Sequence, residues 1–329
     1  MENWQNPYET RESLYRGWEL HELGRRLSAI ALALLVLMLA QKGLGLLALL
    51  VRQALRARGW GMGPAAVLGQ ELIVYLLSLA LPILLLHLLC PLREEEPACF
   101  ALPRPGFFLP AAGMTVGAAV LAGMASSLLT ALLGRLLGGT IALYRTTILS
   151  GAWPMLLSAV SAAVTPALME ELLFRGAVFR RLRRFGDGFA VVFSALLFAL
   201  CHTTVGQMLP AFVSGLFLAL FAVRSGSLLT PMLIHFLYNF LVFLAAAWGL
   251  YGGEAGSRLS GLVFAAFGLA AFLLSYGALG KQYGEVFRLA PGSSGLSRGD
   301  RIRAVLTNIP TLVMAGMFLY TTVGAIRVS

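Results

Sequence analysis

Long apolar stretches alternate with short polar segments along the whole chain. Several windows hold at least 18 mostly apolar residues, about the length that an α-helix needs to cross a bilayer. The pattern predicts nine helices, at about 27–51, 65–91, 107–137, 153–180, 188–203, 206–223, 228–250, 258–280 and 304–326. The fifth and sixth are short and nearly continuous, which leaves a re-entrant pair as an alternative to two separate helices. We therefore predict an all-α fold, a polytopic transmembrane bundle with about eight or nine spans.

Polar segments divide this pattern into four parts. Residues 1–26 alternate charged and apolar side chains, which predicts a cytoplasmic or interfacial segment with an interfacial helix over 8–26. N-terminal transmembrane helices follow over 27–138, a second group over 153–250, and C-terminal helices over 258–329. Within this last part, residues 281–303 are polar and rich in Gly, Ser and Arg. We expect a flexible cytoplasmic linker there.

Composition excludes a soluble protein. Of the 329 residues, 58% are hydrophobic and 12% are charged, whereas about a quarter of the residues in a soluble domain are charged. The mean hydropathy is +0.81. The net charge of +10 does not indicate nucleic acid as a partner, because the basic residues lie in short loops between apolar segments. The three cysteines, Cys90, Cys99 and Cys201, have no paired spacing, so we expect free thiols and no thiolate metal site.

The distribution of basic residues predicts the orientation. With the N-terminus in the cytoplasm, sixteen Lys and Arg residues fall inside and six outside, while Lys42, Arg135 and Arg175 lie within helices. The cluster at 180–184 is the strongest anchor, and the basic loop at 52–58 is an exception. We predict a multi-pass integral membrane protein with a cytoplasmic N-terminus, located in the plasma membrane if its source is bacterial.

Two short patterns bear on structure and on chemistry. Gly113, Gly117 and Gly123 lie on the third predicted helix and favour close packing against another helix. Residues 295–299 read G-L-S-R-G, which formally fits the serine hydrolase sequence G-x-S-x-G. No strand precedes this polar segment, so we interpret the match as chance.

Ionisable side chains are scarce inside the predicted helices, where each costs several kcal/mol unless it is paired or faces a cavity. Those of the first three helices, for which we expect pairing between helices, are Lys42, Glu71, His87 and Arg135. Those of the next four helices are Glu170, Glu171, Arg175, His202 and His235. The clustering of the second group indicates a functional site.

The two glutamates of this cluster face different ways. Glu171 and Arg175 are spaced i, i+4 with the acid first, which favours an ion pair within the helix. Glu170 points about 100° away, so it must find a partner on another helix or act chemically. Pro166 removes a backbone donor and predicts a kink just before the glutamates.

Three motifs follow one another along the chain, on the fourth, fifth and seventh predicted helices. They are Glu170-Glu171-x-x-x-Arg175, Phe198-x-x-x-His202 and His235-x-x-x-Asn239. Together they resemble the CAAX-protease and bacteriocin-processing family of intramembrane peptidases, also called the Abi or prenyl-protease family. The resemblance covers residues 153–245 and implies that 153–250 is a catalytic transmembrane core. It implies an intramembrane endopeptidase for a membrane-associated peptide or protein tail, lipidated or not, acting in peptide maturation or bacteriocin self-immunity.

The resemblance also implies a role for each motif residue. Glu170 and His202 would activate a water for attack on a peptide carbonyl. His235 and Asn239 would donate hydrogen bonds to the oxyanion. Two further residues would support the site: Glu171 and Arg175.

Two alternatives stay open. No cofactor is assigned, but Glu170, His202 and His235 could bind a divalent metal such as zinc as a His₂Glu set with an open water position. Buried Glu and His residues also form proton relays, so the protein could be a non-enzymatic carrier or a regulatory scaffold. A carrier more often contains an internal repeat, and this sequence has none that we recognise.

Overall fold

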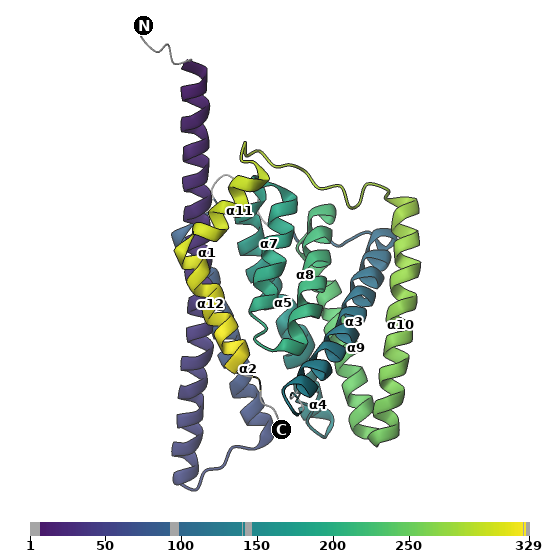
Figure 1. Cartoon of the computed structure of the whole chain (residues 1–329). Coiled ribbons are helices and arrows are strands. Elements are labelled where there is room, and N and C mark those ends of the chain that lie inside the picture. The colour runs from purple at the N-terminus through teal and green to yellow at the C-terminus, as the bar shows by residue number, and fades with distance from the viewer. Residues whose placement is uncertain (1–6, 93–98, 140, 142–146, 325, 327–329) are drawn as a thin grey trace.

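The computed structural model of the chain describes residues 7–92, 99–139, 141, 147–324 and 326, with side chains from residue 13 onward. Every element of this described part is a helix (Figure 1), as the sequence predicted. In chain order the elements are α1 (Pro7–Ala57), α2 (Pro64–Leu89), α3 (Pro105–Leu136), α4 (Ala152–Ala159), η1 (Val160–Val164), α5 (Thr165–Glu171), η2 (Leu172–Phe179), α6 (Arg180–Leu182), η3 (Arg183–Phe185), α7 (Asp187–Leu200), α8 (Val205–Ser225), α9 (Leu229–Tyr251), α10 (Gly253–Gln282), α11 (Arg298–Thr307) and α12 (Ile309–Gly324).

Seven helices in the described part are long and apolar enough to cross a membrane, or eight if α11 and α12 form one bent span. All nine predicted segments are helical, but the fifth and the ninth are not simple spans. The fifth, α7, has 14 residues, about 21 Å at the helical rise, against a hydrocarbon core of about 30 Å. The ninth bends by 67° between α11 and α12, because Pro310 cannot continue the helix and the Asn308 side chain accepts a hydrogen bond from Thr311 N.

The N-terminal helix differs from the prediction. α1 is one continuous helix of 51 residues, so a separate interfacial helix over 8–26 is wrong. The reason is an apolar stripe with helical spacing that passes through the predicted boundary without a break. Leu23, Leu27, Ile30 and Leu34 all lie on it and are each at most 1% exposed.

The basic segments meet at one end of the bundle. The ends of α2, α8 and α10 and the starts of α3, α7 and α11 all lie there (Figure 1), together with the 180–184 cluster. At the opposite end lies the basic segment at 52–58, which departs from the predicted distribution of charge. Arg52 lies 3.2 Å from Glu71, so part of the positive charge of this segment is neutralised. Three of the counted residues, Arg93, Arg145 and Arg327, lie outside the described residues. The orientation towards the cytoplasm stays a prediction.

Of the four ionisable residues of the first three helices that we expected to pair between helices, one does so among the described residues. Glu71 pairs across helices, with Arg52 rather than with Lys42 or Arg135. Within the part of the chain that is described, Lys42, His87 and Arg135 form no ion pair. All three cysteines are free, as predicted.

Glycines allow α3 and α10 to pack closely. A Cβ on Gly113 would lie 2.2 Å from Ser275 Oγ, and one on Gly117 would lie 2.5 Å from Gly268 O. A side chain at Gly117 would force the helices apart, because it meets the backbone of α10, whereas one at Gly113 would first displace the Ser275 hydroxyl. The third predicted packing glycine, Gly123, has no atom within 4 Å of such a Cβ, so the prediction holds for two of the three.

The polar segment between α10 and α11, residues 283–297, is tied to the bundle. We call it the strap; it crosses the basic end (Figure 1). Glu19 of α1 is fully buried, and its Oε2 accepts hydrogen bonds of 2.8 Å from both Ser294 Oγ and Gly295 N. Ser294 N also donates to Arg184 O at 3.1 Å. The expectation of a flexible linker is therefore wrong, because a buried carboxylate fixes its middle.

The G-x-S-x-G sequence has a structural role. Ser297 is the N-cap of α11: its Oγ accepts a hydrogen bond from Asp300 N, and its own N–H donates to the Asp300 carboxylate. This capping box accounts for the serine without catalysis. Asp300 also pairs with Arg16 of α1 at 2.5 Å.

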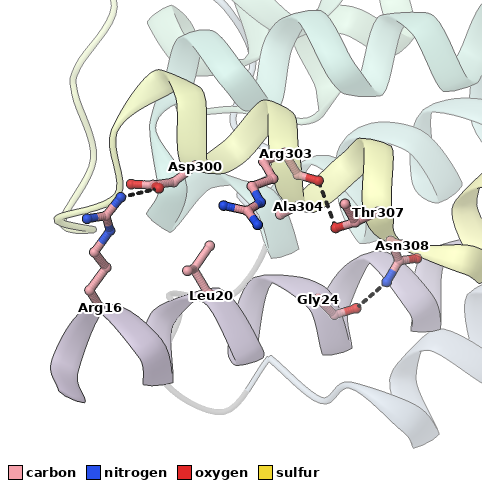
Figure 2. Close-up of a pocket in the computed structure, with 8 residues that line it drawn as sticks. All are labelled: Arg16, Leu20, Gly24, Asp300, Arg303, Ala304, Thr307 and Asn308. Carbon is pink, nitrogen blue, oxygen red and sulfur yellow. Dashed lines mark hydrogen bonds and ion pairs between the residues drawn. The ribbon is translucent and has the colours of Figure 1, made fainter. Parts of the chain in front are cut away.

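A groove of about 550 Å³ lies between α1 and α11 (Figure 2). Its walls include Arg16 and Leu20 from α1 and Arg303 and Asn308 from the C-terminal side. None of the six candidate catalytic and supporting residues lines it, so the groove is not part of the candidate site.

Candidate active site

The span that carries the two glutamates lies at the centre of the bundle and departs from regular α-helical geometry. Its α5 and η2 segments contact α2, α7, α8 and α9 between them. Two π-helical stretches, η1 and η2, flank the seven-residue α5. A new α-helical segment begins at Thr165, next to Pro166, where the sequence predicts a kink. Wider π turns inside helices are frequent at functional sites, and here they enclose Glu170 and Glu171.

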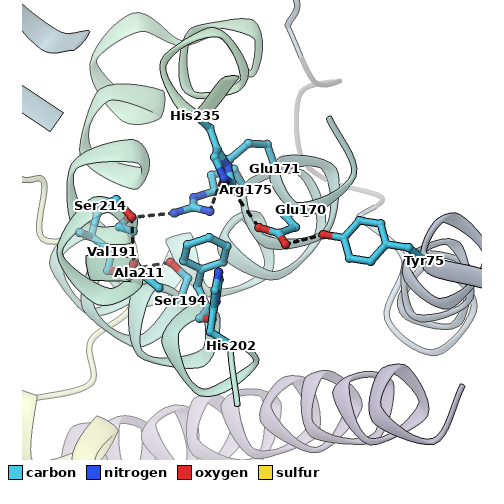
Figure 3. Close-up of polar contacts among 12 residues, drawn as sticks. Tyr75, Glu170, Glu171, Arg175, Val191, Ser194, His202, Ala211, Ser214 and His235 are labelled. Carbon is cyan, nitrogen blue, oxygen red and sulfur yellow. Dashed lines mark hydrogen bonds and ion pairs between the residues drawn. The ribbon is translucent and has the colours of Figure 1, made fainter. Parts of the chain in front are cut away.

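Glu171 is the centre of a fully buried network (Figure 3). Its Oε1 lies 2.8 Å from Arg175 Nη1 and 2.8 Å from His235 Nδ1. The predicted ion pair within the helix is therefore present, with side-chain exposures of 0% for Glu171 and 1% for Arg175. The pair has one further hydrogen bond, from Arg175 Nη2 to Gly215 O of α8 at 3.0 Å. Glu171 Oε2 and Arg175 Nε are buried without a hydrogen-bond partner among the described residues, which makes the pair costly to bury.

Phe198 and Gly215 help to position the Arg175 side chain. The Phe198 ring of α7 lies 4.6 Å from the guanidinium carbon, a cation–π contact. A Cβ on Gly215 would lie 3.2 Å from both Ala195 and Phe198, so the glycine lets α8 approach α7 and present its carbonyl. Gly215 is in none of the three motifs. A glycine within an apolar helix was the one sequence feature that could have indicated its role.

Glu170 faces a different set of groups. Its Oε1 accepts a 2.5 Å hydrogen bond from the hydroxyl of Tyr75 on α2. Its Oε2 is buried without a hydrogen-bond partner and lies 3.8 Å from His235 Nε2, beyond hydrogen-bonding distance. One carboxylate oxygen is thus held and the other is free. Tyr75 lies outside the motifs.

The hydrogen bonds indicate which imidazole nitrogen carries the proton. Glu171 Oε1 accepts from Arg175, so the Nδ1 of His235 is the donor in their contact. His202 Nδ1 lies 2.9 Å from the Phe198 carbonyl oxygen, which can only accept. In the neutral form, each ring therefore has a lone pair on Nε2.

His202 is joined to the cluster through an aromatic ring. It lies in the turn after α7, next to Thr203, whose φ of +38° is strained for a β-branched residue. The Phe198 ring centroid is 4.7 Å from that of His202 and 5.9 Å from that of His235. No hydrogen bond links His202 to Glu170 in the described part of the chain.

Asn239 lies one turn beyond His235 on α9. It is partly buried, and among the described residues its side chain forms no hydrogen bond. The site therefore joins four predicted residues in direct contact, reaches His202 through Phe198, and leaves the Asn239 amide available.

The residues present do not fit a three-ligand metal site. Among the described residues, no three His, Cys, Asp or Glu side chains come together as they must to hold an ion. Glu170 and His235 approach each other, but His202 does not complete the set.

A comparison with known families finds one family model that matches the part of the chain carrying this site. Residues 151–241 match the family model described as Type II CAAX prenyl endopeptidase Rce1-like. This segment is a CAAX-protease domain. No curated protein and no solved structure matches the chain. The CAAX-protease domain contains all three motifs, so the resemblance inferred from them is confirmed, and the chain is a multi-pass membrane protein with a domain of a peptidase family. Helices α1 to α3 and α10 to α12 lie outside the matched segment.

Proposed function

We propose that this protein is an intramembrane endopeptidase in which Glu170 activates the attacking water. One observation carries the proposal: within the CAAX-protease domain, Glu170 Oε2 is buried, has no hydrogen-bond partner and faces the Nε2 of His235. A carboxylate oxygen with an unused lone pair is what proton abstraction from water requires. An unpaired carboxylate inside a membrane span lowers stability. A catalytic role for Glu170 would explain why it is present there.

The proposed reaction is direct hydrolysis of a peptide bond. Water transfers a proton to Glu170 Oε2 while its oxygen bonds to the carbonyl carbon, and the carbonyl oxygen becomes an oxyanion. The C–N bond then breaks, Glu170 returns the proton to the leaving nitrogen, and the products are a new carboxyl end and a new amine. His202, with its lone pair on Nε2, accepts a hydrogen bond from the water and helps to orient it.

Two donors serve the oxyanion under different conditions. The Asn239 amide donates whatever its surroundings. His235 donates from Nε2 only when its ring is doubly protonated, because its Nδ1 proton is directed to Glu171. Glu171 and Arg175 act on His235: they fix its ring and the nitrogen that faces the reacting centre.

The proposed substrate is a membrane-associated peptide or protein tail. Glu170 and His235 lie on helices that are long and apolar enough to cross a membrane, and the family model's description names a prenyl endopeptidase. A prenylated C-terminal peptide is therefore the first substrate to test. We also propose a cytoplasmic N-terminus, because the basic ends of the helices gather on one side. The membrane would be the plasma membrane if the source is bacterial.

The test is cleavage of lipidated and unlipidated peptides by the purified protein, with and without a chelator. Glu170→Gln should lower the rate by at least about 100-fold. The matched control is Glu71→Gln, which alters a glutamate of α2 that is half exposed and paired with Arg52, and it should leave the rate unchanged.

A second pair of variants repeats the comparison for histidine. His235→Ala should abolish cleavage, and His87→Ala, at an exposed position of α2, should not. Cleavage that survives both site substitutions would overturn the proposal. Proton-coupled transport that depends on Glu170, without cleavage of any peptide, would favour a carrier instead.

A further inference from the structure

Helix α2 directs one stripe of side chains into the bundle. The stripe has helical spacing and consists of Leu68, Tyr75, Leu79, Pro82 and Leu86. Four of its members are apolar, and the fifth, Tyr75, carries a hydroxyl. Ser78 is also buried on α2, but its hydroxyl donates to Val74 O within the same helix, whereas the Tyr75 hydroxyl points away from α2. A hydroxyl that enters an apolar interior is costly unless it is hydrogen-bonded, so this tyrosine requires a partner inside the bundle.

That partner is Glu170 of the CAAX-protease domain. The Tyr75 hydroxyl donates to Oε1 at 2.5 Å, whereas Oε2 of the same carboxylate has no hydrogen-bond partner. The last torsion of a glutamate side chain is broad, so an unanchored carboxylate samples several orientations. A hydrogen bond to one oxygen restricts that torsion and decides which oxygen faces His235.

We propose that Tyr75 is a positioning residue of the peptidase site. It holds Glu170 Oε1 so that Oε2 stays beside His235 and is free to take the proton of the attacking water. The inference rests on the proposed function. It also assigns a task to α2, which lies outside the matched segment 151–241: the site is complete only when this helix packs against the domain.

The kinetic test is Tyr75→Phe in the full-length protein, which removes one oxygen and keeps the ring. We expect kcat to fall by about 10- to 100-fold, since a hydrogen bond to a charged group is lost. KM should stay within about twofold, because Tyr75 acts through Glu170 and not on the substrate.

The matched control is Ser78→Ala, one turn further along α2. Ser78 is fully buried, and its hydroxyl donates to Val74 O at 2.7 Å without touching the site. This variant also loses a buried hydroxyl of α2 but should keep kcat. Equal losses in the two variants would indicate general damage to α2 and would overturn the proposal.

A spectroscopic measurement tests the hydrogen bond between Tyr75 and Glu170 without any substrate. In infrared difference spectra between two pH values, the Glu170 carboxyl band is identified as the band that is absent from Glu170→Gln. Tyr75→Phe should shift this band, and Ser78→Ala should not. An unshifted band would refute the contact even if the wild-type protein cleaves no peptide.

The two measurements separate the two proposals. Wild-type protein that cleaves no lipidated or unlipidated peptide contradicts the proposed function, whatever the spectra show. Wild-type protein that cleaves, with Tyr75→Phe as fast as wild type, contradicts the positioning role alone.

Discussion

The buried pair of Glu171 and Arg175 leads to a prediction about stability. Arg175→Leu removes the cation and keeps an apolar side chain of moderate size. Glu171 then keeps His235 as its hydrogen-bond partner, while its Oε2 already has none. The variant also loses the hydrogen bond to Gly215 O and the contact with Phe198.

The magnitude follows from burial. Removing one partner of a buried ion pair costs about 3–5 kcal/mol, because the other charge stays buried and uncompensated. Single hydrogen bonds between membrane helices contribute only about 0.6 kcal/mol, so the stranded carboxylate dominates the loss. At about 2 °C per kcal/mol for a large chain, the unfolding temperature of Arg175→Leu should fall by about 6–10 °C.

The chain offers a matched control with the same spacing and opposite exposure. Arg258 pairs with Glu254 at i, i+4, and their side chains are 77% and 82% exposed. An exposed pair contributes about 1 kcal/mol or less, so Arg258→Leu should shift the unfolding temperature by about 2 °C at most.

The assay is thermal unfolding in detergent at one fixed scan rate, followed with a thiol-reactive dye that reports exposure of the buried Cys90. Arg175→Lys keeps the charge but cannot reach Glu171 and Gly215 together with two nitrogens of a planar group, so it should lie between wild type and Arg175→Leu. If Arg175→Leu unfolds no earlier than Arg258→Leu, the burial argument is refuted.

Two further predictions concern the rest of the bundle. Gly117→Ala should lower the unfolding temperature, because its Cβ would lie 2.5 Å from a backbone oxygen of α10. Gly123→Ala should not, because its Cβ would have no atom within 4 Å. Equal shifts in the two variants would contradict the close packing of α3 against α10. Glu19→Ala should speed tryptic cleavage within the strap severalfold, since it removes both 2.8 Å hydrogen bonds to that segment, and Glu254→Ala serves as the control. A strap that is cleaved at the wild-type rate would show that Glu19 does not hold it.

Apolar length and intramembrane charge made much of this structure predictable. The spans follow from apolar windows because a helix satisfies its own backbone hydrogen bonds in lipid. The contact between Glu171 and Arg175 follows from spacing within one helix. These are local properties, and both predictions are confirmed.

The remaining features depend on distant contacts or on small departures from regular geometry. Tyr75 and Glu170 are 95 residues apart, and the helical periodicity of α2 shows which face is buried but not what that face meets. The anchoring of the strap depends on Glu19, 275 residues from Ser294. The π-helical turns around the glutamates leave no mark in a 3.6-residue period. Polar composition alone therefore predicted a flexible linker where a buried carboxylate holds the chain.

The roles of Glu170 and its neighbours are proposals, and the decisive measurement follows the oxygen of water. A single turnover on a cleavable peptide is run in water enriched in ¹⁸O, and the product and the peptide containing Glu170 are weighed by mass spectrometry. We predict ¹⁸O in the new carboxyl group of the product, none in Glu170, and product formation at least about 100-fold slower with Glu170→Gln. Label in Glu170 would indicate a covalent acyl intermediate, and product formed by Glu170→Gln at the wild-type rate would show that another group activates the water; either result would contradict the account.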